Sequence, residues 1–104
     1  MPSDININIG KTFGNHSCIY NFMKLNTGFR INNKSKKPIW VFISNYSNNE
    51  GSDEWYVIRS GCSDLWVRSS FEVVVVRFSE DHNDRKGFYT YPSEISVYEN
   101  RVIR

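Results

Sequence analysis

The chain of 104 residues contains no alanine, only two cysteines and no long apolar run. Because alanine is the strongest helix former, its absence leaves an apolar content drawn mainly from Val, Ile, Phe, Tyr and Trp, which favour β-strands. No stretch approaches the ~20 apolar residues of a membrane-spanning helix, and the N-terminus lacks the features of a secretory signal. We therefore expect one soluble all-β domain over residues 1–104, cytoplasmic or exported by a non-classical route.

Strong charge of one sign is also missing, since the formal net charge is only +2 and basic residues alternate with acidic ones. Binding to a nucleic-acid backbone usually needs a basic face, so nucleic acid is not an expected partner. The histidines, His16 and His82, fall in loops predicted to lie at opposite ends, and no nucleophile motif accompanies either. The sequence therefore predicts a protein that is not an enzyme and needs no cofactor.

Short alternating segments, separated by turn residues, predict seven or eight strands. Two of them, at 38–44 and 71–78, are apolar on both faces and are expected in the middle of a sheet, with Trp40 in the core. The segment 60–68 is interpreted as a turn-rich link, and 101–104 as an extension of the last strand. The expected fold is an antiparallel β-sandwich, with a barrel as the alternative. The predicted strands are 4–9, 18–24, 29–32, 38–44, 54–59, 71–78, 86–91 and 94–99.

The loop that follows the strand at 38–44 has the residues of a carbohydrate site. A pyranose offers an apolar patch and a set of hydroxyls, so its sites pair an aromatic face with groups that donate and accept hydrogen bonds. If successive strands alternate in direction, the loop at 45–53 lies beside the loop at 80–85. The predicted carbohydrate-binding residues are Asn45, Tyr46, Asn48, Asp53, Trp55, Asp84 and Arg85.

Two features of these loops bear on the ligand. Arg85 presents a cationic fork suited to a carboxylate such as that of sialic acid, whereas the neighbouring acids favour neutral, galactose-type sugars. The same acids could also bind Ca²⁺, which prefers 6–8 oxygen ligands, although solvated acidic loops are the favoured interpretation. A second set of sugar-binding residue types occurs at Ser63, Asp64, Trp66 and Arg68.

The cysteines, Cys18 and Cys62, are too far apart for a metal knuckle and too few for a disulfide scaffold. A bridge between them would close a loop of about 45 residues, worth roughly 4 kcal/mol in the loop-entropy model. In a reducing cytosol, two small buried thiols are the favoured interpretation.

Three stretches, at 38–48, 63–68 and 71–78, resemble those of the small slime-mould hemagglutinins and of related uncharacterised fungal proteins. The resemblance covers roughly residues 28–99. It implies a lectin with an immunoglobulin-like β-sandwich, which binds glycans on cell surfaces or glycoproteins and agglutinates cells. The order Cys18, Trp40, Cys62 then implies an inter-sheet disulfide packed on Trp40. Agglutination needs two sites per particle, from a homodimer or from both loop ends.

Two alternatives come from other functional classes. One is a protein-interaction or structural module without a sugar site, in which the Asn- and Ser-rich loops are only solvated. The other is a Ca²⁺-dependent surface binder that recognises anionic lipid.

Overall fold

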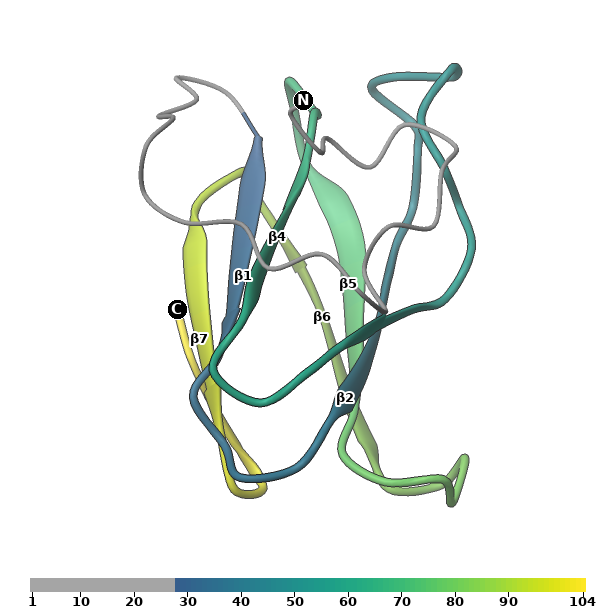
Figure 1. The fold of residues 1–104 in the computed structure, drawn as a ribbon. Coiled ribbons are helices and arrows are strands. Elements are labelled where there is room, and N and C mark those ends of the chain that lie inside the picture. Colours follow the sequence, from purple (N-terminus) through teal and green to yellow (C-terminus); the bar gives the residue numbers. More distant parts are fainter. Residues whose placement is uncertain (1–27) are drawn as a thin grey trace.

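The structure, a computed structural model, describes residues 28–104. Within this range the chain forms eight strands and no helix (Figure 1). The strands are β1 (Phe29–Asn33), β2 (Ile39–Ile43), β3 (Tyr56–Ile58), β4 (Ser63–Trp66), β5 (Glu72–Arg77), β6 (Arg85–Thr90), β7 (Glu94–Tyr98) and β8 (Arg101–Ile103). Accordingly, the described residues contain no helix that is long and apolar enough to cross a membrane.

The strands form two four-stranded sheets that face each other, in the orders β4-β1-β7-β8 and β3-β2-β5-β6 (Figure 1). The predicted all-β sandwich of seven to eight short strands is thereby confirmed. One pairing departs from the antiparallel pattern: β1 and β7 run parallel, with Ile31 opposite Ile95. The other pairings of the described strands are antiparallel.

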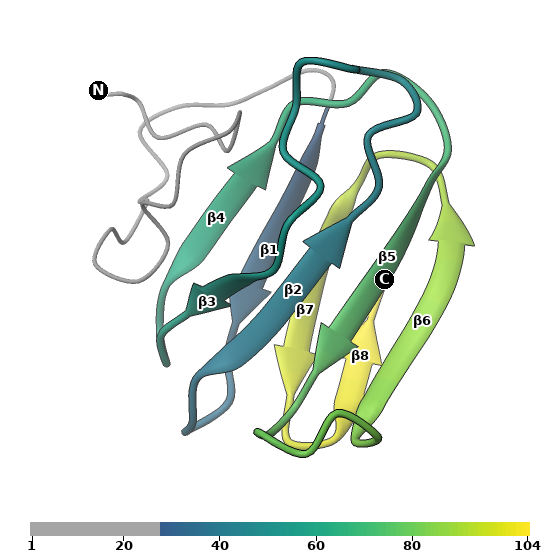
Figure 2. The same cartoon turned by 90° about the vertical axis from the view of Figure 1, so that its right-hand side faces the viewer.

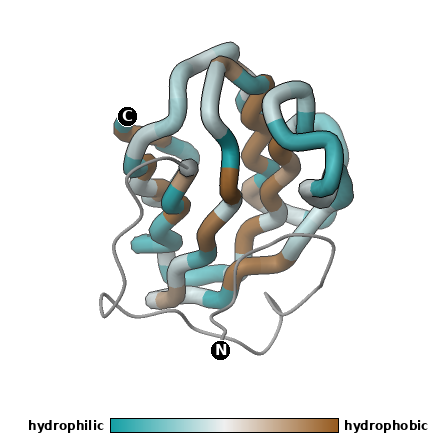
Figure 3. The backbone as a smooth tube through the Cα atoms, turned by 90° about the horizontal axis from the view of Figure 1, so that it is seen from above, coloured by the Kyte–Doolittle hydropathy of each residue, from teal (hydrophilic) through white to brown (hydrophobic). Residues whose placement is uncertain are grey.

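The core lies between the sheets because apolar side chains recur at every second residue, and side chains of a strand point alternately to its two faces. On β2, Ile39, Val41 and Ile43 are fully buried, and the residues between them are half-buried on the outer face. On β5, Val74 and Val76 are buried in the same way. Figure 3 shows that the hydrophobic residues are concentrated along the strands.

Two predicted boundaries are wrong. The segment interpreted as a link contains β4, which pairs with β1 and places Leu65 opposite Arg30. The C-terminal residues do not extend β7, because Asn100 has a φ of 56° and turns the chain back, so that β8 pairs with β7. The strands predicted at 4–9 and 18–24 lie outside the described residues.

Because β4 was not predicted, every strand after it runs in the direction opposite to the one expected from simple alternation. The backbone NH of Ser44, at the end of β2, donates to the carbonyl of Val73. Phe78, at the end of β5, lies at the opposite end of this antiparallel pair, where its NH donates to the carbonyl of Asp84. The loops at 45–53 and 80–85 therefore lie at opposite ends of the sandwich, and their predicted juxtaposition is wrong (Figure 2).

Trp40, expected in the core, and Trp66, expected among sugar-binding residues, occupy the opposite positions. Trp66 is fully buried and meets Tyr56 edge-on, with ring centroids 6.0 Å apart, whereas Trp40 is half-buried on the outer face of β2. Asp64 and Arg68 are also fully buried. The second set of sugar-binding residue types is therefore part of the protein interior.

Cys62 is buried in the core immediately before β4. Its predicted partner, Cys18, lies outside the described residues, so the bridge stays a prediction. Because Trp40 faces away from this core, the expected packing of a bridge on Trp40 is wrong.

The contrast between the two tryptophans can be measured by urea unfolding. Replacing Trp66 by alanine empties a core site, and such changes cost about 3–5 kcal/mol. Trp40→Ala, the matched control, removes the same side chain from the outer face and should cost clearly less. A larger loss for Trp40→Ala than for Trp66→Ala would contradict this assignment of the core.

Candidate functional site

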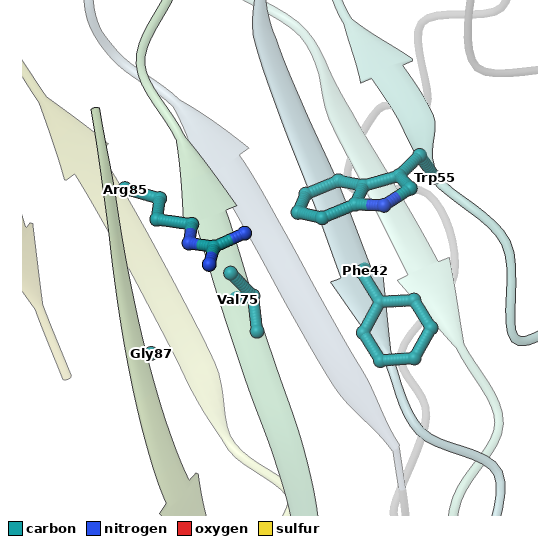
Figure 4. A pocket seen from close by; sticks show the side chains of 5 residues that line it. All are labelled: Phe42, Trp55, Val75, Arg85 and Gly87. Carbon is teal, nitrogen blue, oxygen red and sulfur yellow. The ribbon is translucent and has the colours of Figure 1, made fainter. Parts of the chain in front are cut away.

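A pocket of about 390 Å³ opens on the outer face of the β3-β2-β5-β6 sheet. Figure 4 shows the indole of Trp55 and the guanidinium of Arg85 reaching toward one another above the sheet. The residues that line the pocket are Phe42, Trp55, Val75, Arg85 and Gly87.

Strand register explains why these residues meet. Phe42 pairs with Val75 across β2 and β5, and Val75 pairs with Gly87 across β5 and β6. Paired residues project on the same side of a sheet, so these three form the floor. Trp55 lies one residue before β3, with its ring centroid 5.7 Å from that of Phe42, and it remains 37% exposed. The pocket therefore has an apolar floor and one aromatic wall with an accessible surface.

Arg77 contacts the indole of Trp55, which forms the aromatic wall of the pocket. Its guanidinium carbon lies 4.8 Å from the ring centroid of Trp40 and 5.3 Å from that of Trp55. Its Nε donates to the carbonyl of Ser79, and one Nη lies 3.4 Å from Nδ1 of His82. Cation–π contacts of this kind are worth about 0.5–2 kcal/mol. Arg77 thus ties the indole of Trp55 to the sheet.

Gly87 keeps the floor open. A Cβ added there would lie 3.5 Å from Cγ2 of Val75 and 3.6 Å from the carbonyl oxygen of Val74, both ordinary van der Waals contacts. Its φ is not in the left-handed range, so the backbone does not require glycine. Glycine in a strand often marks a place where another molecule approaches closely, and here it creates space in the pocket.

The loop that carries Trp55 is organised by Arg68, which is fully buried. Its Nε donates to the carbonyl of Ser44 at 2.7 Å, and an Nη donates to the carbonyl of Ser52 at 2.6 Å. These contacts tie the two ends of the loop together. Gly51 packs against the guanidinium, where a Cβ would come within 2.3 Å of an Nη atom.

Glu72, also fully buried, forms an ion pair with Arg68 at 3.9 Å. Its carboxylate accepts hydrogen bonds from the hydroxyl of Ser44 and from the backbone NH groups of Tyr46 and Ser47. Burial by itself would raise the pKa of Glu72, but these hydrogen bonds together outweigh it and hold the pKa below its usual value. Burial lowers the pKa of Arg68, and the charge of Glu72 opposes that shift.

Of the predicted carbohydrate-binding residues, the structure brings Trp55 and Arg85 together. Two others support the loop: the amide of Asn45 donates to the carbonyl of Gly51, and that of Asn48 to the carbonyl of Val67. The rest lie away from the pocket lining. Tyr46 and Asp53 are exposed on the loop after β2, and Asp84 belongs to the loop at the opposite end.

The two acidic loops also lie at opposite ends, so they cannot share a calcium ion. Within residues 28–104, no group of three or more His, Cys, Asp or Glu side chains is arranged to hold a metal.

Three pocket residues, Phe42, Val75 and Gly87, were missed from the sequence. Phe42 and Val75 belong to strands that are apolar on both faces, which was interpreted only as burial in a sheet. A glycine inside the predicted strand at 86–91 was the other available signal.

A cluster of exposed aromatic rings continues the same face toward the other end of β6. Phe71 stacks on Tyr89 with ring centroids 5.2 Å apart and meets Tyr91 edge-on at 5.1 Å. All three are between 45% and 65% exposed. Tyr89 pairs with Val73, so it lies on the pocket side of the sheet.

Comparison with known proteins finds no matching family model, no matching curated protein and no matching solved structure.

The ion pair between Arg68 and Glu72 generates a prediction about pH. A carboxyl whose pKa is lower in the folded state stabilises the fold above its unfolded pKa, about 4.3 for Glu, and this contribution is lost as the pH falls through the folded pKa. Glu72→Gln leaves Arg68 without its counter-charge, which at neutral pH should cost about 3–5 kcal/mol. The difference in unfolding free energy between wild type and Glu72→Gln should shrink as the pH falls below about 4. Urea unfolding across this range measures it, and a constant difference would contradict the assignment.

Proposed function

We propose that the protein is a non-catalytic lectin that binds glycans of cell surfaces or glycoproteins in the outer-face pocket. The observation that supports this most directly is the exposed indole of Trp55 beside an open floor at Gly87. An aromatic face next to a hydrogen-bonding group is the combination that a sugar ring needs, and Arg85 supplies the hydrogen-bonding group.

In this proposal the apolar face of one pyranose stacks on Trp55, and its edge enters the space above Gly87. Phe42 and Val75 supply the apolar floor. The pocket volume, about 390 Å³, is within the range of small-molecule sites. The proposed site therefore differs from the loop-end site predicted from the sequence, although it keeps Trp55 and Arg85.

Agglutination of cells requires two such sites in one particle, because one site alone cannot cross-link. We propose that a homodimer provides the second site, in the form of a second copy of the same pocket. Sedimentation of the pure protein in the presence and absence of glycan tests the dimer.

Replacing Trp55 by alanine should abolish agglutination and weaken glycan binding about tenfold or more, the effect of losing about 1.4 kcal/mol of contact energy. The matched control is Tyr46→Ala, which removes an aromatic side chain that is 79% exposed on the same loop but outside the pocket. A glycan array and red-cell agglutination measure both variants, and circular dichroism checks folding. Loss of binding in Tyr46→Ala with retention in Trp55→Ala would place the ligand on the loop end instead.

Filling the floor of the pocket should abolish glycan binding without lowering the stability of the fold. Gly87→Val adds a side chain directed into the pocket, so glycan binding should be lost. Stability should hold or rise, because glycine within a strand costs roughly 0.5–1 kcal/mol relative to alanine and a Cβ meets no close contact. Glycan binding and urea unfolding are measured on the same preparation. A stable Gly87→Val protein with unchanged binding would rule out this pocket.

The alternative is a protein-interaction module, and the exposed cluster of Phe71, Tyr89 and Tyr91 favours it, since aromatic residues are enriched at interfaces. The experiments above distinguish the two functions. If a protein partner binds this cluster, its binding should be lost in Tyr89→Ala and unchanged in Trp55→Ala.

A further inference from the structure

We infer that the ligand of this pocket is an anionic sugar, whose carboxylate or sulfate group binds the guanidinium of Arg85. This inference rests on the proposed lectin function and adds the class of glycan. Three features of the described residues support it: the availability of Arg85, the charge of Arg77 beneath the pocket, and the absence of acids from its lining.

Arg85 is available for a ligand. It is exposed at the start of β6 and lines the pocket. Among residues 28–104, no carboxylate lies within ion-pair distance of its guanidinium and no side chain accepts a hydrogen bond from it. A guanidinium presents a planar fork of donors that matches the two oxygens of a carboxylate or sulfate.

Arg85 also lies opposite a second cation. Arg77 and Arg85 are cross-strand partners on β5 and β6, and like charges placed directly opposite each other destabilise a sheet. Arg77 is only 7% exposed, and within residues 28–104 its contacts are aromatic rings, a carbonyl and an imidazole rather than a carboxylate. An anion bound at Arg85 would relieve this repulsion, so the pairing of the two arginines favours an anionic ligand.

The acids that favoured a neutral sugar are not part of the pocket. Asp53 lies on the loop after β2 and Asp84 on the loop before β6, and neither belongs to the lining. The lining consists of two aromatic rings, a valine, a glycine and one cation. This composition suits a sugar ring that stacks on Trp55 and directs its anionic substituent toward β6.

The experiment compares binding of the wild-type protein to immobilised glycans in matched sets. Each set contains one neutral glycan and its sialylated, uronate-containing and sulfated counterparts. Charged members should bind about tenfold or more tightly than the neutral member. Binding should weaken as ionic strength rises, because salt screens a partly exposed charge pair. Carboxylate and sulfate members tested separately show which anion is preferred.

The variant Arg85→Gln should remove the preference for charged glycans and leave residual binding to the neutral members through Trp55. Lys86→Gln is the matched control. It removes the same charge from the adjacent residue of β6, which is exposed but projects from the opposite face of the strand. Arg85→Lys, which keeps the charge but loses the planar fork, should retain part of the preference.

The outcomes separate the inference from the function on which it rests. Charged glycans that lose their advantage in Arg85→Gln and keep it in Lys86→Gln would support the inference. Equal binding of neutral and charged members that is sensitive to Trp55→Ala would overturn the inference and leave the lectin function standing. An equal effect of Arg85→Gln and Lys86→Gln would show that net charge alone is responsible and would also overturn it. Absence of binding to every glycan would overturn both.

Discussion

The buried ion pair between Arg68 and Glu72 is the interaction on which the arrangement of the pocket depends. Arg68 donates to backbone carbonyls at both ends of the loop after β2, while Glu72 accepts from backbone and hydroxyl groups near its start. Removing two charges from water carries a large desolvation cost, which a close partner and several hydrogen bonds must offset. Both conditions are met here. We interpret the pair as a device for specifying one loop conformation, because its hydrogen bonds go to the backbone of the loop itself.

Most of the described fold could be predicted from the sequence, because the residues of β1, β2, β5, β6 and β7 alternate or are strongly β-prone. β4 could not. Its sequence, Ser63–Trp66, follows Gly61 and Cys62 and contains a serine and an aspartate, so local composition favours a turn. The strand forms because β1 offers it a partner and because Trp66 fills the core, and both reasons are tertiary. One missed strand then reversed every later strand and moved the loop at 80–85 to the wrong end of the molecule.

The candidate site shows a different limit. Trp55 and Arg85 were predicted to lie in one site, but for a reason that the structure contradicts. The loops at 45–53 and 80–85 were expected side by side, and they lie at opposite ends of the sandwich. The two side chains meet because Trp55 turns back over the sheet onto Phe42, and because Arg85 begins β6 on the same face. Composition alone does not reveal such a meeting, because it depends on the register of β2, β5 and β6. With the register known, the two-sided pattern of the strands at 38–44 and 71–78 becomes informative, since their outer residues form the floor.

The two ends of the segment from Ser44 to Trp55 are held by different forces, and this division suits a binding site. The start is fixed by the buried charges of Arg68 and Glu72, out of reach of a ligand. The end is fixed by Trp55 on Phe42 and by the guanidinium of Arg77, which contacts the indole while the ring stays partly exposed. A ligand that stacks on Trp55 therefore meets a ring already in position, and little conformational entropy is lost on binding. Within the described residues Arg77 has no carboxylate partner, so the side chain that contacts the indole also places a positive charge beneath the ring. The position of the ring and this positive charge thus come from the same side chain, which belongs to β5 and pairs with Arg85 on β6.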